Sequence, residues 1–307
     1  MGGVIEGFGT IAAVIALGAL LAQLRVVDDR ARVVLSRLSF FVASPALMVT
    51  VLGDTDVTTV LSQNLVATVA GVLVAVALYV LAARLVWRRA LPETVVGSLS
   101  AAYVNAGNLG LPIAAYVLGD AALVAPTLLL QLLVLQPLAL ALLDHATSER
   151  RFSVGRAMAR PLTNPLTVGS ILGLLLSLTG FPLPAVVRDP LELVGGMAVP
   201  SMLIAYGISL RLGPRPGHGT SATEVGLISV LKLVVQPLTA YLVARFVLGV
   251  GDTGLLAVTV LAALPTAQNI FVHATRYGRG EVLARDSIFV TTLASVPVVL
   301  VIAAVLG

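Results

Sequence analysis

The sequence predicts an all-α membrane protein with ten membrane-spanning helices. Hydrophobic residues make up 58% of the chain and charged residues 11%. Apolar runs recur along the whole sequence, and each has the ~20 residues that a helix needs to cross a ~30 Å hydrocarbon core. Two of these runs carry matching interruptions at corresponding places, which indicates that the second half of the chain repeats the first half upside down.

Each expected span is an apolar run bounded by charged or polar residues, and a helix is the form in which such a run satisfies its own backbone in lipid. The ten expected ranges are 5–24, 33–52, 64–87, 93–118, 121–143, 164–179, 191–210, 225–248, 253–275 and 284–306. The segment Met1–Glu6 lacks the positive region of a cleaved signal peptide, so we expect the first span to be retained.

Arginines set the expected orientation because they gather in alternate connections between the spans. One side of the membrane carries Arg25, Arg30, Arg32, Arg37, Arg84, Arg88, Arg89, Arg150, Arg151, Arg156, Arg160, Arg211, Arg215, Arg276, Arg279 and Arg285. The other side carries mainly aspartates, with Arg188 and Arg245 as exceptions. The positive-inside rule then places both termini outside the cytoplasm. Abundant Arg, Ala, Val and Leu with one lysine suits a prokaryote with a GC-rich genome, so we expect its inner (plasma) membrane.

An odd number of spans in each half inverts the second half relative to the first. We therefore expect a first repeat at 1–144, a cytoplasmic linker at 145–164 and a second, inverted repeat at 165–307. Pro45 in the second span and Pro200 in the seventh lie in similar surroundings and predict kinks.

The fourth and ninth spans are expected to be broken and to cross near the middle of the membrane. They contain the segments Val104–Pro112 and Leu264–Asn269. A proline ring excludes a helical hydrogen bond, so Pro112 would free the carbonyl of Asn108, and Pro265 that of Leu261. Irregular backbone survives in lipid only where protein buries it or where it lines a cavity. The amides that would serve this backbone are those of Asn105, Asn108, Gln268 and Asn269.

The chemistry expected at this crossing favours a small anion. Helix N-termini carry roughly half a positive charge and free N–H donors, although the C-termini at the same crossing could equally favour a cation. Every Asp and Glu falls in a loop or near the end of a span, whereas a proton or cation carrier would be expected to place an acid in the membrane. A carboxylate is therefore the expected ligand, and a sodium- or proton-coupled symporter or antiporter is the alternative.

Other polar residues within the spans have two interpretations each. Lys232, the sole lysine, could snorkel to the interface or could hold the unwound backbone as a fixed charge. Gln131 and Gln136 could join helices or line a cavity, and His273 follows Asn269 on the same helical face but lies near the cytoplasmic end. Gly169 and Gly173 predict close helix packing.

Several functional classes find little or no support in the sequence. The chain has no cysteine, its three histidines lack metal-ligand spacing, and it has no phosphate-binding loop, so neither a metal nor another cofactor is expected. Its basic residues read as topology signals, which argues against a nucleic-acid partner. Gly249–Asp252 matches a string of intramembrane aspartyl proteases, but Asp252 has no second buried aspartate, so a membrane-embedded enzyme is the least supported alternative.

Over essentially its whole length the chain resembles the auxin efflux carrier family, whose prokaryotic members include malonate and malate permease-like proteins. The resemblance is carried by Asn105-Ala-Gly-Asn-Leu-Gly-Leu-Pro112, by Pro265-Thr-Ala-Gln-Asn269 followed by Ala274–Gly278, by Gly173 with the Pro184 region, and by Lys232 with Pro237.

This resemblance implies a crossover fold like that of sodium/proton antiporters and bile-acid symporters. It implies a scaffold from spans 1, 2, 6 and 7, a transport domain from spans 3–5 and 8–10, elevator-type transport of small organic anions and a homodimer in the lipid bilayer. The residues that it assigns to the substrate are Asn105, Asn108, Gln131, Pro112 and Pro265, with Ser44 as a further candidate. The long central loop of plant members is missing, so auxin is not the expected cargo.

Overall fold

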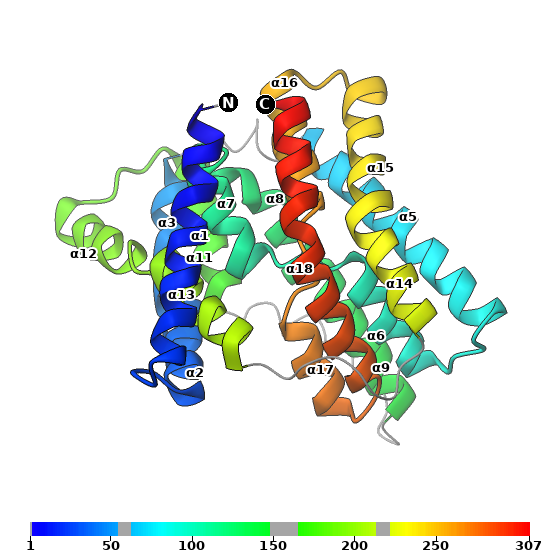
Figure 1. Cartoon of the computed structure of the whole chain (residues 1–307). Coiled ribbons are helices and arrows are strands. Elements are labelled where there is room, and N and C mark those ends of the chain that lie inside the picture. Colours follow the sequence, from blue (N-terminus) through cyan, green and yellow to red (C-terminus); the bar gives the residue numbers. More distant parts are fainter. Residues whose placement is uncertain (1, 55–62, 148–164, 213–221) are drawn as a thin grey trace. The chain divides into compact units, whose positions relative to one another are not determined.

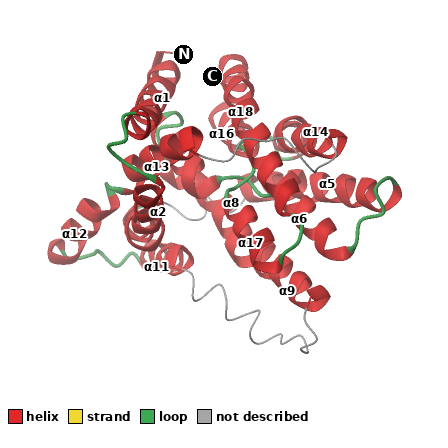
Figure 2. Cartoon of the chain, turned by 60° about the horizontal axis from the view of Figure 1, so that its bottom comes forward, coloured by secondary structure: helices red, strands yellow, loops and turns green. Residues whose placement is uncertain are grey.

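The computed structural model describes residues 2–54, 63–147, 165–212 and 222–307. Within these ranges the regular elements are helices and no strand occurs, as Figure 2 shows. The expected all-α class is therefore confirmed. The linker expected at 145–164 lies outside the described residues except for its first three positions, which belong to the end of a helix.

Helices occupy each of the ten ranges in which a span is expected. Those long and apolar enough to cross a membrane, among the described residues, are Asp29–Gly53, Gln63–Leu85, Ala121–Ala146, Ala185–Leu212, Ala222–Val247 and Glu281–Leu306. Shorter apolar helices lie at Ala12–Gln23, Pro165–Thr179 and Asp252–Ala262. The protein is thus a multi-pass membrane protein, and the count of ten stays a prediction.

The chain divides into two compact units, and each unit draws on both halves of the sequence. Unit 1 contains residues 1–62, 107–129 and 161–214, and unit 2 contains residues 63–106, 130–160 and 215–307. The boundary between 106 and 107 falls inside the fourth expected span, and that between 129 and 130 falls inside the fifth.

Unit 1 is built mainly from two closely packed helix pairs. Its helices are α1 (Gly2–Gln23), α2 (Asp29–Leu38), α3 (Ser44–Gly53), α7 (Leu111–Tyr116), α8 (Ala125–Leu129), α11 (Pro165–Thr179), α12 (Ala185–Gly195) and α13 (Ala198–Leu212). A π-helical turn, Ser39–Ala43, joins α2 to α3, and Pro45 follows this turn inside the continuous helix Asp29–Gly53. Helix α1 packs along α13, and α3 packs along α11 (Figure 1).

Glycines allow both pairs to approach closely. A Cβ added to Gly207 of α13 would lie 2.0 Å from the carbonyl oxygen of Ile15 in α1. In the other pair, a Cβ at Gly169 or Gly173 would lie 2.5 Å from a backbone oxygen of α3. Real side chains do not fit at such distances, so the helix backbones touch directly at these positions. The packing role expected for Gly169 and Gly173 is confirmed.

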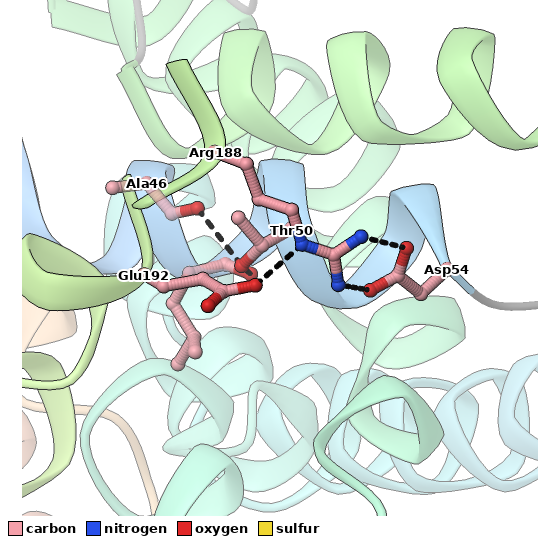
Figure 3. Close-up of polar contacts among 6 residues, drawn as sticks. Ala46, Thr50, Asp54, Arg188 and Glu192 are labelled. Atoms are coloured by element: carbon pink, nitrogen blue, oxygen red, sulfur yellow. Dashed lines mark hydrogen bonds and ion pairs between the residues drawn. The ribbon is translucent and has the colours of Figure 1, made fainter. Parts of the chain in front are cut away.

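Helix α12 is tied to α3 by an ion cluster centred on Arg188 (Figure 3). Its guanidinium donates to both carboxylate oxygens of Asp54, at 2.6 Å from Nη2 and 3.4 Å from Nη1, while Nε lies 2.6 Å from Glu192 Oε1. One of the two basic exceptions on the predicted outer side is therefore compensated by two acids.

Unit 2 contains the two longest described helices, α5 and α18. It also contains α6 and α16, the helices that end at the two breaks. Its helices are α5 (Gln63–Leu85), α6 (Leu91–Ala102), α9 (Gln136–Thr147), α14 (Ala222–Val230), α15 (Gln236–Leu242), α16 (Asp252–Ala262), α17 (Asn269–Tyr277) and α18 (Glu281–Leu306). The π-helical turns Leu130–Leu135, Leu231–Val235 and Val243–Val247 continue these helices. Helix α5 packs against α6 and α15, and α18 packs against α14, α16 and α17.

A buried carboxylate fixes one end of unit 2. Glu224, in the first turn of α14, is fully buried and accepts hydrogen bonds from Tyr79 of α5 and from Arg89 in the loop after α5. The hydrogen bond to Glu224 is the main reason that the pKa of Arg89 lies above its usual value. A Cβ at Gly97 of α6 would clash with the Tyr79 ring, so α6 passes directly beside this cluster.

Candidate functional site

The first break is a short extended segment between two helical pieces. Helix α6 ends at Ala102, and Tyr103 adopts an extended backbone with φ −84° and ψ 106°. A π-helical turn begins at Ala106, and α7 begins at Leu111 with Pro112 in its first turn. The helical stretch runs without a gap from Ala106 through Tyr116, so Pro112 lies within it, directly after the π-helical turn.

The second break lies between α16, which ends at Ala262, and α17, which begins at Asn269. Pro265 lies in the non-helical stretch between them. The carbonyl of Leu261, which we expected to be freed, accepts a long hydrogen bond of 3.4 Å from the backbone N–H of Leu264. The break is thus closed by a tight turn at the end of α16.

The two breaks pair with each other inside unit 2. Val104 and Thr266 form an isolated antiparallel β-bridge. The backbone N–H of Asn105 donates to the carbonyl of Pro265 at 2.8 Å, and the N–H of Ala267 donates to the carbonyl of Tyr103 at 3.1 Å. Backbone groups that have lost their helical partners are therefore satisfied by the other break, as a buried backbone requires.

Side chains from neighbouring helices satisfy the rest of this backbone. Gln131 donates from Nε2 to the carbonyl of Val104 at 3.0 Å, and Thr291 accepts from the N–H of Thr266 at 3.1 Å. The hydroxyl of Thr266 donates to the carbonyl of Ser100 at 2.6 Å, near the end of α6. Each hydrogen bond removes the cost of a buried polar group without a partner, roughly 1–3 kcal/mol.

Lys232 is placed directly at the end of α6. Its side chain is 0% exposed, and its ammonium donates to the carbonyl of Ala102 at 3.2 Å and to Gln236 Oε1 at 2.7 Å. Gln236 donates in turn to the same carbonyl at 3.1 Å. A positive charge at a helix C-terminus interacts favourably with the helix dipole. Of the two interpretations of Lys232, the structure shows the contact with the unwound backbone and not snorkelling.

The side chain of Tyr103 makes a second set of polar contacts at the first break. The Tyr103 hydroxyl donates to Gln136 Oε1 at 3.2 Å, and the Asn269 side chain also hydrogen-bonds this hydroxyl. Tyr103 is buried, while Gln136 and Asn269 are half-buried. The start of α17 is thereby tied to α9 through a tyrosine of the first break.

The residues proposed for the site are divided between the units. Unit 2 contains Asn105, Gln131, Lys232, Pro265, Gln268, Asn269 and His273, whereas unit 1 contains Ser44, Asn108 and Pro112. Within unit 2, Asn105, Gln131 and Pro265 gather at the bridge between the breaks. Gln268 and His273 are half-buried, and Ser44 is fully buried at the start of α3.

Several contributors to this arrangement did not stand out in the sequence. Tyr103, Gln236, Thr266 and Thr291 all bind backbone or side chains at the breaks. Two of these residues could have been selected from their spacing in the sequence. Gln236 follows Lys232 by one helical turn, and Thr291 belongs to a row of buried hydroxyls on α18 spaced by four residues, Ser287, Thr291 and Ser295.

The buried acids that the structure describes in unit 2 are already engaged. Glu224 is held by Tyr79 and Arg89, and Asp286 of α18, 7% exposed, pairs with Arg285 at 2.8 Å. Among the residues that the structure describes, no three His, Asp or Glu side chains gather closely enough to hold a metal ion. The buried basic group that lacks an acid beside it in the described contacts at the breaks is the amine of Lys232.

Comparison with known proteins agrees with this architecture. The family profile described as "Membrane transport protein" matches residues 5–303. The chain belongs to this membrane transport protein family. The family is that of the auxin efflux carriers, so the resemblance carried by the sequence motifs is confirmed. The protein is accordingly a membrane transporter and not an enzyme.

A curated relative in Rhizobium meliloti (strain 1021) is named "Putative malonate transporter". The two chains are 27% identical over 266 residues, which cover 84% of this chain and 82% of the relative. The similarity therefore includes residues of both units.

Proposed function

We propose that this transporter carries small organic anions, with carboxylates such as malonate and malate as its substrates. The observation that carries the proposal is the buried ammonium of Lys232 at the end of α6, which has amide and carbonyl oxygens but no described carboxylate beside it. An uncompensated positive charge in a membrane protein favours an anionic ligand nearby. The name of the Rhizobium relative supports the same class of substrate.

Transport is proposed to need no coupling cation. A cation site in a membrane protein ordinarily includes a buried carboxylate. The buried acids of unit 2, Glu224 and Asp286, are each paired with an arginine. Because Lys232 already supplies a positive charge at the carbonyl of Ala102, a bound sodium ion at that carbonyl would be repelled.

The inverted repeat remains part of this proposal, and the glycine contacts of unit 1 support it. Gly18 of α1 lies against the backbone of Ile204, and Gly173 of α11 lies against the backbone of Val49. The same offset in residue number relates Gly18 to Gly173 and Val49 to Ile204. Equivalent contacts between equivalent residues are expected when the two halves share one fold in opposite orientations.

Alternating access of the elevator type is proposed on the same basis. Spans 1, 2, 6 and 7 fall in unit 1, spans 3, 8, 9 and 10 fall in unit 2, and spans 4 and 5 contribute to both. We propose that unit 1 belongs to the scaffold and unit 2 to the transport domain. A homodimer in the inner membrane of a prokaryote, with both termini outside the cytoplasm, completes the proposal.

Uptake or counterflow of labelled malonate, malate and an aromatic monocarboxylate into proteoliposomes tests this function. Asn108→Ala removes an amide proposed to contact substrate, and Gly226→Ala, where an added Cβ meets nothing within 4 Å, is the matched control. We expect saturable transport in the wild type and the control, and its loss in Asn108→Ala. A folded wild-type protein that moves none of these anions would contradict the proposal.

A further inference from the structure

Gln131 presents an unused hydrogen-bond acceptor beside the first break. The side chain is 2% exposed, and Nε2 donates to the carbonyl of Val104 at 3.0 Å. A carbonyl can only accept, so this contact determines which end of the amide is the NH2 group. Oε1 is buried and has no hydrogen-bond partner among the residues that the structure describes.

Asn269 presents a second acceptor of the same kind. The Tyr103 hydroxyl donates its single proton to Gln136 Oε1. Its oxygen therefore accepts the hydrogen bond from the Asn269 side chain, and the donor is the NH2 group of Asn269. Asn269 Oδ1 is buried and likewise has no partner in the described part of the chain. The residue itself is half-buried, so its surroundings are not closed on every side.

Both amides are anchored to the same extended segment, through the adjacent residues Tyr103 and Val104. In each amide the NH2 group is hydrogen-bonded, and the carbonyl oxygen has no described partner. A bare carboxylate offers only acceptors, so it would gain nothing from these two oxygens and would be repelled by them. An unpaired buried acceptor destabilises the protein, and a ligand with a donor would recover that free energy.

We propose that the transported anion carries an O–H donor as well as its carboxylate, and that Gln131 Oε1 or Asn269 Oδ1 accepts from it. The donor is an alcohol hydroxyl or the proton of a second, un-ionised carboxyl group. This inference rests on the proposed transport of organic anions and narrows it to hydroxy acids and half-protonated dicarboxylates. A sodium ion is the less suitable occupant because the buried acids described in unit 2 are paired with arginines.

Two matched pairs of labelled substrates test the inference in proteoliposomes: malonate with hydroxymalonate, and succinate with malate. Within each pair the molecules differ by one hydroxyl. The initial uptake rate of each is measured at low concentration across a range of pH. One hydrogen bond of about 1.4 kcal/mol corresponds to a preference of about tenfold. An alcohol donor gives this preference for the hydroxylated partner at every pH. A carboxyl donor gives faster uptake of both partners as the pH falls through their second ionisation.

Gln131→Leu and Asn269→Leu each remove one acceptor, and Gln236→Leu is the matched control. Gln236 is a buried glutamine whose amide oxygen and nitrogen are both engaged. We expect the hydroxyl preference, or the pH effect, to fall toward one in at least one of the first two variants. In Gln236→Leu the rate should fall while the preference is retained. Because the preference is a ratio, it does not depend on how much protein has folded.

The possible outcomes separate the two proposals. Uptake of malonate and succinate with neither a hydroxyl preference nor a pH effect overturns the inference and leaves the proposed function standing. A preference that persists in both acceptor variants also overturns it, as does uptake that requires sodium. Absence of uptake for all four anions overturns the proposed function itself, and the inference with it.

Discussion

In unit 1 the helices meet backbone to backbone across glycines, whereas in unit 2 polar side chains fill the space around two interrupted helices. The first arrangement leaves no room for an added atom at Gly18, Gly173 or Gly207. The second needs Lys232, Gln131 and other polar groups to satisfy exposed helix ends. Unit 1 should therefore be sensitive to added volume, and unit 2 to lost hydrogen bonds. This difference fits the proposal that unit 1 belongs to the scaffold and unit 2 to the transport domain.

Gly207→Ala should have the largest effect on stability. The new methyl group would lie 2.0 Å from the backbone oxygen of Ile15, so α1 and α13 would have to separate. Overpacking of this kind costs about 3 kcal/mol. Thermal unfolding in detergent should show a clear loss of stability, while Gly226→Ala in open surroundings should melt like the wild type. An unchanged melting temperature for Gly207→Ala would contradict the close approach of the two helices.

Lys232→Met tests the polar side of the comparison. Methionine keeps most of the volume but removes the donor to Ala102 and Gln236, and with it the buried positive charge. We expect anion uptake at low substrate concentration to fall at least tenfold, about 1.4 kcal/mol. Lys232→Arg keeps the charge and is the control expected to retain more activity. Wild-type uptake by the Met variant would show that the charge does not act on the substrate.

Thr291→Val should have a smaller effect, limited to one hydrogen bond. The N–H of Thr266 would lose its acceptor in the second break, at a cost of about 1 kcal/mol. Thr259→Val is the matched control because the Thr259 hydroxyl bonds only to its own helix, at the carbonyl of Leu255. Amide hydrogen exchange at residues 264–268 should accelerate in the first variant and not in the second. Equal protection in both would mean that Thr291 does not hold the break.

Arg188→Gln should have the smallest effect. The ion cluster with Asp54 and Glu192 lies at an exposed position, and exposed pairs contribute little to stability. The melting temperature in detergent should change less than in Thr291→Val, and the small change should shrink further at high salt. A larger loss than that of Gly207→Ala would reverse the comparison, because unit 1 would then depend on charge rather than on close packing.

The sequence predicted the helical class, the positions of both breaks and the packing of Gly169 and Gly173, because each depends on local residue types. It did not predict the π-helical turn that precedes Pro112. It also placed Glu224 correctly near the end of a span but could not show that the side chain is buried, since its partners Tyr79 and Arg89 lie far away in the sequence. Long-range pairing of this kind is decided by the tertiary fold.

The candidate site shows the same division. Asn105, Gln131 and Asn269 could be selected from the motif, but the direction in which each amide points could not. Tyr103 reads as one more apolar residue at a helix end, and its hydroxyl contacts with Gln136 and Asn269 join three separate segments. Which atoms remain available to a ligand therefore follows from the structure alone.

Because Lys232 is buried, its reaction with an amine-specific reagent can report whether water enters unit 2. The sequence has a single lysine and no cysteine, so an amine-reactive reagent can meet the N-terminus and one interior amine and nothing else. With Nζ enclosed at 0% exposure, that interior amine should resist acylation as long as unit 2 keeps the packing described above. A condition that lets water reach the end of α6 should therefore allow acylation of Lys232. Mass spectrometry of the wild-type protein would then detect a second acylated amine.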